Sequence, residues 1–173
     1  MSASPLRPAV IFDRDGTLNI DRGYTHRPED LAFTPGAPAA IARLNRRGVL
    51  VIVATNQSGV ARGYFDENAV ARFHARMQDA LAPFGAHIDA FYYCPFHEEA
   101  ADATYRAANH PDRKPNPGMI VRALCEWPID PARCVLIGDE ERDLLAARAA
   151  HIRGALYTGG ALDALVEAET KGW

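Results

Sequence analysis

Five polar residues have the types that a phosphoryl-transfer site requires, and each lies at the end of an apolar run or beyond one. They are Asp13, Asp15, Thr55, Lys114 and Asp139. Asp13 can attack phosphorus in line, while Asp15, two residues later, can protonate the leaving oxygen and then activate water. The hydroxyl of Thr55 and the ammonium of Lys114 can hold the oxygens of the transferring group, where charge develops in the transition state.

Three of these residues also form a candidate cation site. Magnesium prefers hard oxygen ligands, which the carboxylates of Asp13 and Asp139 and the backbone carbonyl of Asp15 can provide. We therefore predict a Mg²⁺-dependent phosphohydrolase that forms an aspartyl-phosphate intermediate on Asp13. Taken singly, each signal has a commoner structural explanation, since Asp-x-Asp-Gly is often a surface turn and Gly-Asp before a helix is often an N-cap. The prediction depends on all of them occurring in one chain, in the order that the chemistry needs.

Short apolar runs alternate with segments of helical periodicity along the chain. The predicted strands cover residues 9–13, 49–54, 88–93, 134–138 and 155–158, and the predicted helices cover residues 38–47, 66–81, 116–127 and 141–150. Such alternation predicts an α/β fold with a doubly wound parallel sheet, in which ligands bind at the carboxyl ends of the strands. A chain of 173 residues has the size of one ordinary domain, so we expect a single domain over residues 1–173.

The composition narrows the class of partner. Hydrophobic residues make up 48% of the chain and charged residues 24%, which is typical of a soluble globular protein. The formal net charge is -3 without a basic cluster, which disfavours nucleic acid, and no apolar run approaches the roughly 20 residues that span a bilayer. The three cysteines, Cys94, Cys125 and Cys134, are too irregularly spaced for a disulfide framework. We therefore expect a cytoplasmic monomer that acts on small molecules.

Four short motifs resemble those of the haloacid dehalogenase superfamily. They are Asp13-Arg14-Asp15-Gly16-Thr17, Thr55-Asn56-Gln57-Ser58, Arg113-Lys114-Pro115 and Gly138-Asp139. Within the superfamily, residues 19–26, 55–63, 92–95 and 113–119 resemble the D-glycero-D-manno-heptose 1,7-bisphosphate 7-phosphatases, and the related histidinol-phosphate phosphatases share most of these stretches. The resemblance covers residues 9–157 and implies a Rossmann-like haloacid dehalogenase fold, a Mg²⁺ cofactor and a sugar-phosphate substrate.

The same resemblance implies which residues contact the substrate. They are Asp21, Arg22, Gly23, Tyr24, Asn56, Gln57, Ser58 and Arg113. Arg113 could bind a second anionic group through two parallel hydrogen bonds, which fits a bisphosphate. The intervals between the motifs are filled by predicted helices and strands, so we expect a capless member of the superfamily whose site is covered by loops.

The chain departs from the heptose phosphatases in a loop that often holds zinc in that family. Members often carry Cys-x-His followed by Cys-x-Cys, whereas this chain keeps Cys94 but has Phe96 where the histidine is expected. The residues available for a rearranged Zn²⁺ site are Cys94, His97, His110 and Asp112. All four are zinc-competent ligand types. The alternative is a metal-free loop in which Cys94 is a small buried residue.

The second departure is Glu140, which stands where the heptose phosphatases usually carry lysine. An acid at this position weakens a substrate contact and could add a metal ligand, so the residues specify the reaction type better than the substrate. We expect Asp143, one helical turn further on, to steady the loop or the metal from behind its ligands.

Other classes of protein share parts of this pattern. A phospho-accepting receiver module also combines acids, Thr and Lys on a parallel sheet, but its phosphorylated Asp follows the third strand, whereas Asp13 follows the first. A base at Asp15 would also hydrolyse the acyl phosphate that a receiver must preserve. A polynucleotide-end phosphatase shares the expected fold but is disfavoured by the acidic charge balance, and an inactive binding protein is disfavoured because every catalytic position is filled.

Overall fold

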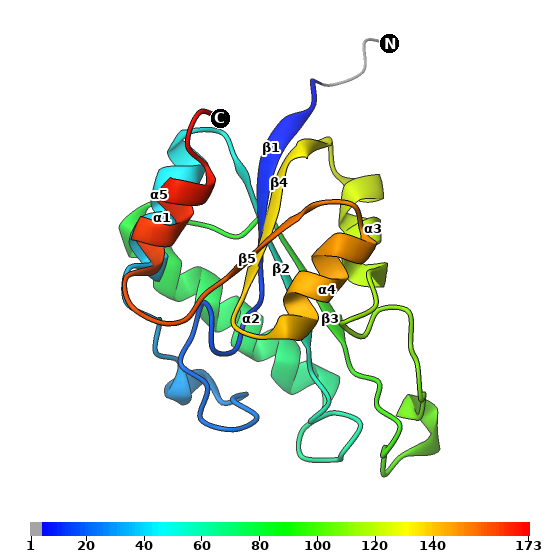
Figure 1. Ribbon diagram of the computed structural model, residues 1–173. Coiled ribbons are helices and arrows are strands. Elements are labelled where there is room, and N and C mark those ends of the chain that lie inside the picture. Colours follow the sequence, from blue (N-terminus) through cyan, green and yellow to red (C-terminus); the bar gives the residue numbers. More distant parts are fainter. Residues whose placement is uncertain (1–4) are drawn as a thin grey trace.

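The protein is built around one parallel sheet of five strands (Figure 1). The computed structural model describes residues 5–173. The strands are β1 (Arg7–Phe12), β2 (Leu50–Asn56), β3 (Ala90–Cys94), β4 (Ile129–Gly138) and β5 (Arg153–Leu156). Their order in the sheet is β3-β2-β1-β4-β5, and each neighbouring pair runs parallel. The predicted doubly wound parallel α/β fold is therefore confirmed, with β1 at its centre.

Helices cover both faces of this sheet. They are α1 (Ala37–Arg46), α2 (Glu67–Leu81), α3 (Gly118–Glu126), α4 (Glu141–Ala149) and α5 (Leu162–Glu169), with 3₁₀ turns at Pro28–Asp30, Ala82–Phe84 and Ala103–Tyr105. α1, α2 and α5 pack on one face, and α3 and α4 pack on the other (Figure 1). Over residues 5–173, no helix has both the length and the apolar character that crossing a membrane demands.

The central strand β1 is buried on both sides because its side chains alternate between two hydrophobic cores. Val10 and Phe12 belong to the core under α1, α2 and α5, whereas Ala9 and Ile11 belong to the core under α3 and α4. All four side chains are fully buried. A continuous apolar run is what a strand covered by helices on both faces requires, and each large buried side chain contributes about 1.5–3 kcal/mol. The strand therefore holds the next residue, Asp13, in a fixed place.

Helix α2 begins and ends as its sequence predicts. The carboxylate of Asp66 accepts a hydrogen bond from the backbone N–H of Ala69 at 2.8 Å and so caps the helix. The buried residues of the predicted apolar stripe are Val70, Phe73, Met77 and Leu81. The same face also buries His74, which the apolar periodicity does not single out.

The elements near the C-terminal end differ from the prediction. β4 begins at Ile129, earlier than predicted, because its pairing with β1 continues across an irregularity in register. β5 covers Arg153–Leu156 rather than residues 155–158, and only one of its residues is buried, so its apolar signal is weak. The apolar pattern of the sequence does not predict α5, which buries only Leu162 and Val166.

The start of α3 also differs from the prediction. The helix begins at Gly118, and the side chain of Asn116 does not cap it. Instead, Asn116 Nδ2 donates hydrogen bonds to Asn109 Oδ1 at 2.7 Å and to the carbonyl of His110 at 2.9 Å. Asn116 therefore stabilises the preceding loop, which contains Lys114.

Candidate active site

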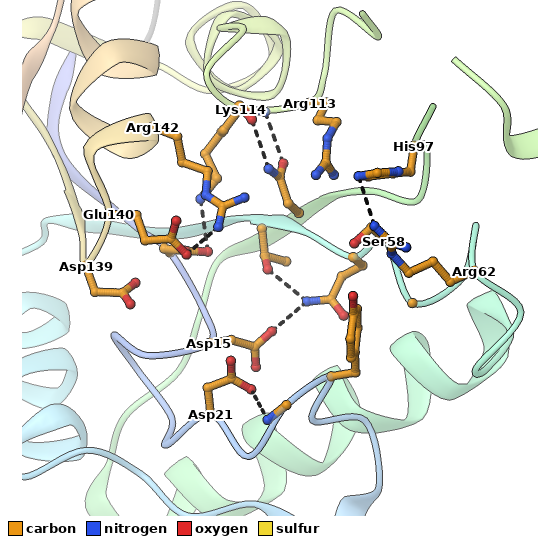
Figure 2. Close-up of a pocket in the computed structure, with 17 residues that line it drawn as sticks. Asp15, Asp21, Ser58, Arg62, His97, Arg113, Lys114, Asp139, Glu140 and Arg142 are labelled. Carbon is orange, nitrogen blue, oxygen red and sulfur yellow. Dashed lines mark hydrogen bonds and ion pairs between the residues drawn. The ribbon is translucent and has the colours of Figure 1, made fainter. Parts of the chain in front are cut away.

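The five residues expected to carry the chemistry meet in one cavity at the carboxyl ends of the strands. The cavity has a volume of about 370 Å³, and its lining includes Asp13, Asp15, Thr55, Lys114 and Asp139. Figure 2 shows Lys114, Asp15 and Asp139 converging on the same space from different elements. Both the volume and the position are those of a small-molecule site in a parallel α/β fold.

Lys114 lies between two carboxylates at the base of the cavity. Its Nζ is 2.9 Å from Asp13 Oδ1 and 2.6 Å from Asp143 Oδ1. Lys114 is only 2% exposed and Asp143 is 0% exposed. Burial raises the pKa of Asp13 to about 6, although the charge of Lys114 opposes this shift. Burial acts to lower the pKa of Lys114, but the two carboxylates outweigh it and hold that pKa above its ordinary value. The ammonium is therefore charged and fixed beside Asp13.

The two oxygens of Asp13 have different surroundings. Oδ1 accepts a hydrogen bond from the backbone N–H of Arg14 at 2.7 Å and also contacts Lys114 Nζ. Within residues 5–173, Oδ2 has no hydrogen-bond or ion-pair partner. One oxygen is thus anchored, and the other keeps its lone pairs for a metal ion or for attack on phosphorus.

The acidic side of the cavity fits a magnesium ion. Ligand oxygens of Asp13, Asp139 and Asp143 lie within 4.8 Å of one another. Asp143 is already committed, because its Oδ1 accepts from Lys114 Nζ and its Oδ2 accepts from the backbone N–H of Glu140 at 3.1 Å. Asp13 and Asp139 remain as hard oxygen donors of the kind that Mg²⁺ prefers. Burial raises the pKa of Asp139, and a divalent cation would offset the cost of burying its charge.

The turn after Asp15 brings Asp139 against the first motif. Gly16 has φ +80°, and a Cβ built on it would lie 2.3 Å from Asp139 Oδ2. Thr17 Oγ1 donates a hydrogen bond to Asp139 Oδ1 at 3.2 Å. Because only glycine combines this φ with the absence of a side chain, Gly16 is what allows the ends of β1 and β4 to approach this closely.

Residues at the end of β2 hold the expected catalytic groups in place. Gln57 Nε2 donates to Asp15 Oδ2 at 2.8 Å and to Thr55 Oγ1 at 2.9 Å. Asn56 makes two hydrogen bonds to the backbone of Lys114, one as donor and one as acceptor, both at 3.0 Å. Both residues line the cavity. Asn56 and Gln57 were expected to contact the substrate, but their side-chain amides instead position Asp15, Thr55 and Lys114.

Most other residues expected to contact the substrate also line the cavity. They are Asp21, Gly23, Tyr24, Ser58 and Arg113. Arg22 is different, because it is not part of the lining within residues 5–173. Its side chain is exposed, and its backbone N–H donates to Thr25 Oγ1 at 2.8 Å. Burial lowers the pKa of Arg113, which is half-buried in the wall of the cavity.

The lining contains two further arginines and a histidine that the sequence does not mark as substrate contacts. Arg62, His97 and Arg142 all line the cavity, and Arg142 forms an ion pair with Glu140. In Figure 2, Arg142 and Glu140 lie on one side of the cavity, and Arg113, His97 and Arg62 lie on the other. Only their positions in the sequence could have indicated that the two arginines face the cavity. Arg62 falls within the stretch 55–63 that resembles the heptose phosphatases, and Arg142 lies in the first turn of the helix after Asp139.

The residues of the rearranged zinc site do not converge. Cys94 Sγ lies 3.9 Å from His110 Nδ1, but that nitrogen accepts the backbone N–H of Asp112 at 3.1 Å. The carboxylate of Asp112 pairs with Arg122 at 3.0 Å, and His97 lines the cavity that contains Asp13. In the part of the chain that the structure describes, the acidic trio is the one group of three potential ligands within 4.8 Å. The geometry therefore does not support a rearranged Zn²⁺ site.

Proteins of similar sequence identify the family. A family model described as HAD-hydrolase-like matches residues 112–171. The chain is 43% identical over 166 residues to the D-glycero-beta-D-manno-heptose-1,7-bisphosphate 7-phosphatase of Rhodopseudomonas palustris, covering 96% of this chain and 92% of that protein. This chain belongs to the heptose-bisphosphate phosphatase family of haloacid dehalogenase-like hydrolases. Another member, the D-glycero-D-manno-heptose-1,7-bisphosphate 7-phosphatase of Thermosynechococcus vestitus, is 42% identical over 164 residues, covering 93% of this chain and 84% of that protein.

Solved structures of haloacid dehalogenase-like phosphatases share the fold. The D,D-heptose 1,7-bisphosphate phosphatase of B. bronchiseptica, complexed with magnesium and phosphate, is 34% identical with a TM-score of 0.78, covering 95% of this chain and 87% of that one. A putative HAD-like phosphatase of Mesorhizobium loti is 34% identical with a TM-score of 0.84, covering 97% and 90%. The Rossmann-like haloacid dehalogenase fold is confirmed, and the magnesium-bound relative supports Mg²⁺ as the cofactor. The chain is therefore a phosphoric monoester hydrolase and not a receiver module.

Proposed function

We propose that this phosphatase removes the 7-phosphate of D-glycero-D-manno-heptose 1,7-bisphosphate through an aspartyl-phosphate intermediate on Asp13. The observation that carries the proposal is the meeting of Asp13, Asp15, Lys114 and Asp139 in a cavity whose lining also presents arginines. This arrangement offers one set of groups for the reacting phosphate and separate cations for a second anion. The substrate is the one for which relatives 42% and 43% identical to this chain are named.

In the first step, an oxygen of Asp13 attacks phosphorus and the bond between phosphorus and the sugar oxygen breaks. Asp15 donates a proton to that oxygen, so the sugar leaves as an alcohol. The ammonium of Lys114 and the hydroxyl of Thr55 hold the equatorial oxygens as their charge develops. Thr55 can donate its proton to phosphate because its oxygen already accepts the N–H of Gln57.

In the second step, water attacks the phosphorus of the aspartyl-phosphate, and Asp15 accepts the proton of this water. Inorganic phosphate leaves and the carboxylate of Asp13 is restored. Asp13, Asp139 and the backbone carbonyl of Asp15 would hold the Mg²⁺ ion, which when bound neutralises the repulsion between carboxylate and phosphate.

Arg113 is the residue that we propose for the second phosphate. It lies in the wall of the cavity directly before Lys114 in the chain, and its planar guanidinium matches a phosphate with two parallel hydrogen bonds. The remaining contacts to the sugar are proposed for Asp21, Gly23, Tyr24 and Ser58, which line the same cavity. Arg22 is left out of this set because of its exposed position.

Histidinol phosphate and simple sugar monophosphates are the alternative substrates. Each carries a single phosphate and would leave Arg113 without an anionic partner, which disfavours them. Glu140, the acid that weakens the match to the heptose phosphatases, is paired with Arg142. Its charge is therefore offset by a neighbour and does not oppose a second phosphate.

Rates of phosphate release from these substrates test the proposal. We expect kcat/KM to be at least about tenfold higher for heptose 1,7-bisphosphate than for histidinol phosphate or sugar monophosphates. Arg113→Met should lower kcat/KM for the bisphosphate by about 10- to 100-fold, since a hydrogen bond to a charged group contributes about 1.5–3 kcal/mol. Arg122→Met, which changes an arginine outside the cavity lining, is the matched control and should leave kcat/KM unchanged for every substrate. Equal rates on all substrates would end the heptose assignment.

We further propose that the enzyme acts as a monomer in the cytoplasm. Cys94, Cys125 and Cys134 are free thiols, which fits a reducing compartment. Light scattering coupled to gel filtration checks the monomer, and a mass corresponding to two chains would overturn that part of the proposal.

A further inference from the structure

Arg14 stands between the nucleophile and the acid in the sequence, yet its side chain is fully buried. Its Nε lies 3.2 Å from Asp15 Oδ1, and one terminal nitrogen lies 2.8 Å from Asp15 Oδ2 and 3.1 Å from Oδ1, so the guanidinium contacts both oxygens of the carboxylate. The same terminal nitrogen donates to the carbonyl of Thr25 at 2.7 Å and to Gln57 Oε1 at 3.1 Å. A buried guanidinium is costly unless its donors are matched. This set of partners therefore fixes the guanidinium in one orientation.

The other terminal nitrogen of Arg14 meets His74, the unexpected polar residue on the buried face of α2. It lies 3.4 Å from His74 Nε2. Burial lowers the pKa of His74 to about 3, and the charge of Arg14 adds to this shift, so the neutral ring can accept a hydrogen bond from the guanidinium. The imidazole stacks on Phe91 of β3 at 4.2 Å, and Arg14 Cζ lies 4.5 Å over the ring of Phe73. Aromatic rings from α2 and β3 thus support both groups.

These contacts form a chain from a helix on one face of the sheet to the carboxylate in the cavity. We propose that Arg14 and His74 are positioning residues: the imidazole of His74 fixes the guanidinium of Arg14, which aims the carboxyl group of Asp15 at the leaving oxygen. Neither side chain touches substrate in this scheme. The inference rests on the acid/base role proposed above for Asp15.

The basicity of the leaving group separates this role from a merely structural one. A sugar alkoxide is a strong base and needs a proton as it departs, whereas p-nitrophenolate is a weak base and departs without one. A variant in which Asp15 is misaligned therefore loses more kcat/KM on a sugar phosphate than on p-nitrophenyl phosphate. Hydrolysis of the aspartyl-phosphate, in which Asp15 acts as base, follows departure of the leaving group and does not enter kcat/KM. A variant that is only less stable loses rate equally on both.

Two substitutions of His74 form a matched pair. His74→Phe keeps a ring that can stack on Phe91 but removes the acceptor nitrogen, whereas His74→Gln places an amide oxygen at a similar reach. In His74→Phe we expect kcat/KM on heptose 1,7-bisphosphate to fall about tenfold, and kcat/KM on p-nitrophenyl phosphate to fall less than about twofold. His74→Gln should restore most of the loss. His87→Phe makes the same exchange at an exposed histidine and should change neither rate.

Arg14→Lys gives an independent test, because lysine keeps the charge but cannot make the paired hydrogen bonds. It should show the same selective loss, and it decides the matter if circular dichroism shows that His74→Phe does not fold. Asp15→Asn is measured beside these variants. A selective loss in Asp15→Asn without one in His74→Phe and Arg14→Lys would overturn the positioning role alone. Equal losses on both substrates in all three variants would remove the acid/base role of Asp15 as well.

Discussion

The ion pair between Lys114 and Asp143 contributes to the folding stability of this phosphatase, although Lys114 also lines the proposed active site. Lys114→Met leaves the carboxylate of Asp143, which is 0% exposed, without the ammonium that lies 2.6 Å away. Leaving a buried charge unpaired costs about 3–5 kcal/mol, a large part of the roughly 5–15 kcal/mol that stabilises a typical domain. At about 2–4 °C per kcal/mol for a chain of this size, Tm should fall by about 6–20 °C.

Thermal unfolding of metal-free protein near neutral pH measures this loss. The double variant Lys114→Met/Asp143→Asn removes both charges, while the amide oxygen of asparagine can still accept the backbone N–H of Glu140. It should therefore recover at least about half of the lost stability. Arg122→Met breaks an exposed pair with Asp112 and should cost less than about 1 kcal/mol. A Tm within about 2 °C of the parent for Lys114→Met, or no recovery in the double variant, would refute the reasoning.

Two further substitutions test the acidic side of the cavity. Gly16→Ala places a Cβ 2.3 Å from Asp139 Oδ2 at a φ of +80°, so kcat/KM should fall at least about 100-fold and a Mg²⁺ titration of activity should shift to higher concentration. Asp13→Asn should remain folded by circular dichroism and keep less than about a hundredth of the rate, and a higher residual rate would exclude the covalent mechanism. The pKa of Asp13 is raised by burial from 3.8 to about 6, so in metal-free protein the stability from this group is complete below about pH 4 and is lost as the pH rises through about 6. Urea unfolding across this range should show the free energy of unfolding of the parent falling by at most about 3 kcal/mol relative to that of Asp13→Asn, in which the other titrating groups are unchanged.

The parts of the fold that were predictable are those with dense apolar signals. β1 and α2 each bury a periodic or continuous set of side chains, so pattern and structure coincide there. β5 buries one residue and α5 buries two. Both elements are held by contacts with distant parts of the chain, which the local sequence pattern does not reveal. The first half of β4 contains Pro131 and charged neighbours, which hide a strand held by pairing with β1.

The candidate site likewise has features that the sequence indicates and features that it does not. The meeting of Asp13, Thr55 and Asp139 in one cavity was predictable because each stands at a strand end, and the carboxyl ends of parallel strands lie at one edge of the sheet. The contact between Arg14 and His74 joins residues far apart in the sequence, and a histidine in a helical stripe carries no sign of it. Arg22 illustrates the opposite case. It belongs to the stretch 19–26 that resembles the heptose phosphatases, yet its side chain is exposed to solvent.

The central place of β1 has a consequence for how the chain folds during synthesis. β1 ends at Phe12, but the strand that pairs with it through Ile137, β4, begins only at Ile129. The ribosome therefore releases the central strand long before one of its two neighbours exists. Until β4 emerges, an unpaired and hydrophobic edge remains open to aggregation or to chaperones, because parallel pairing of distant strands is slow.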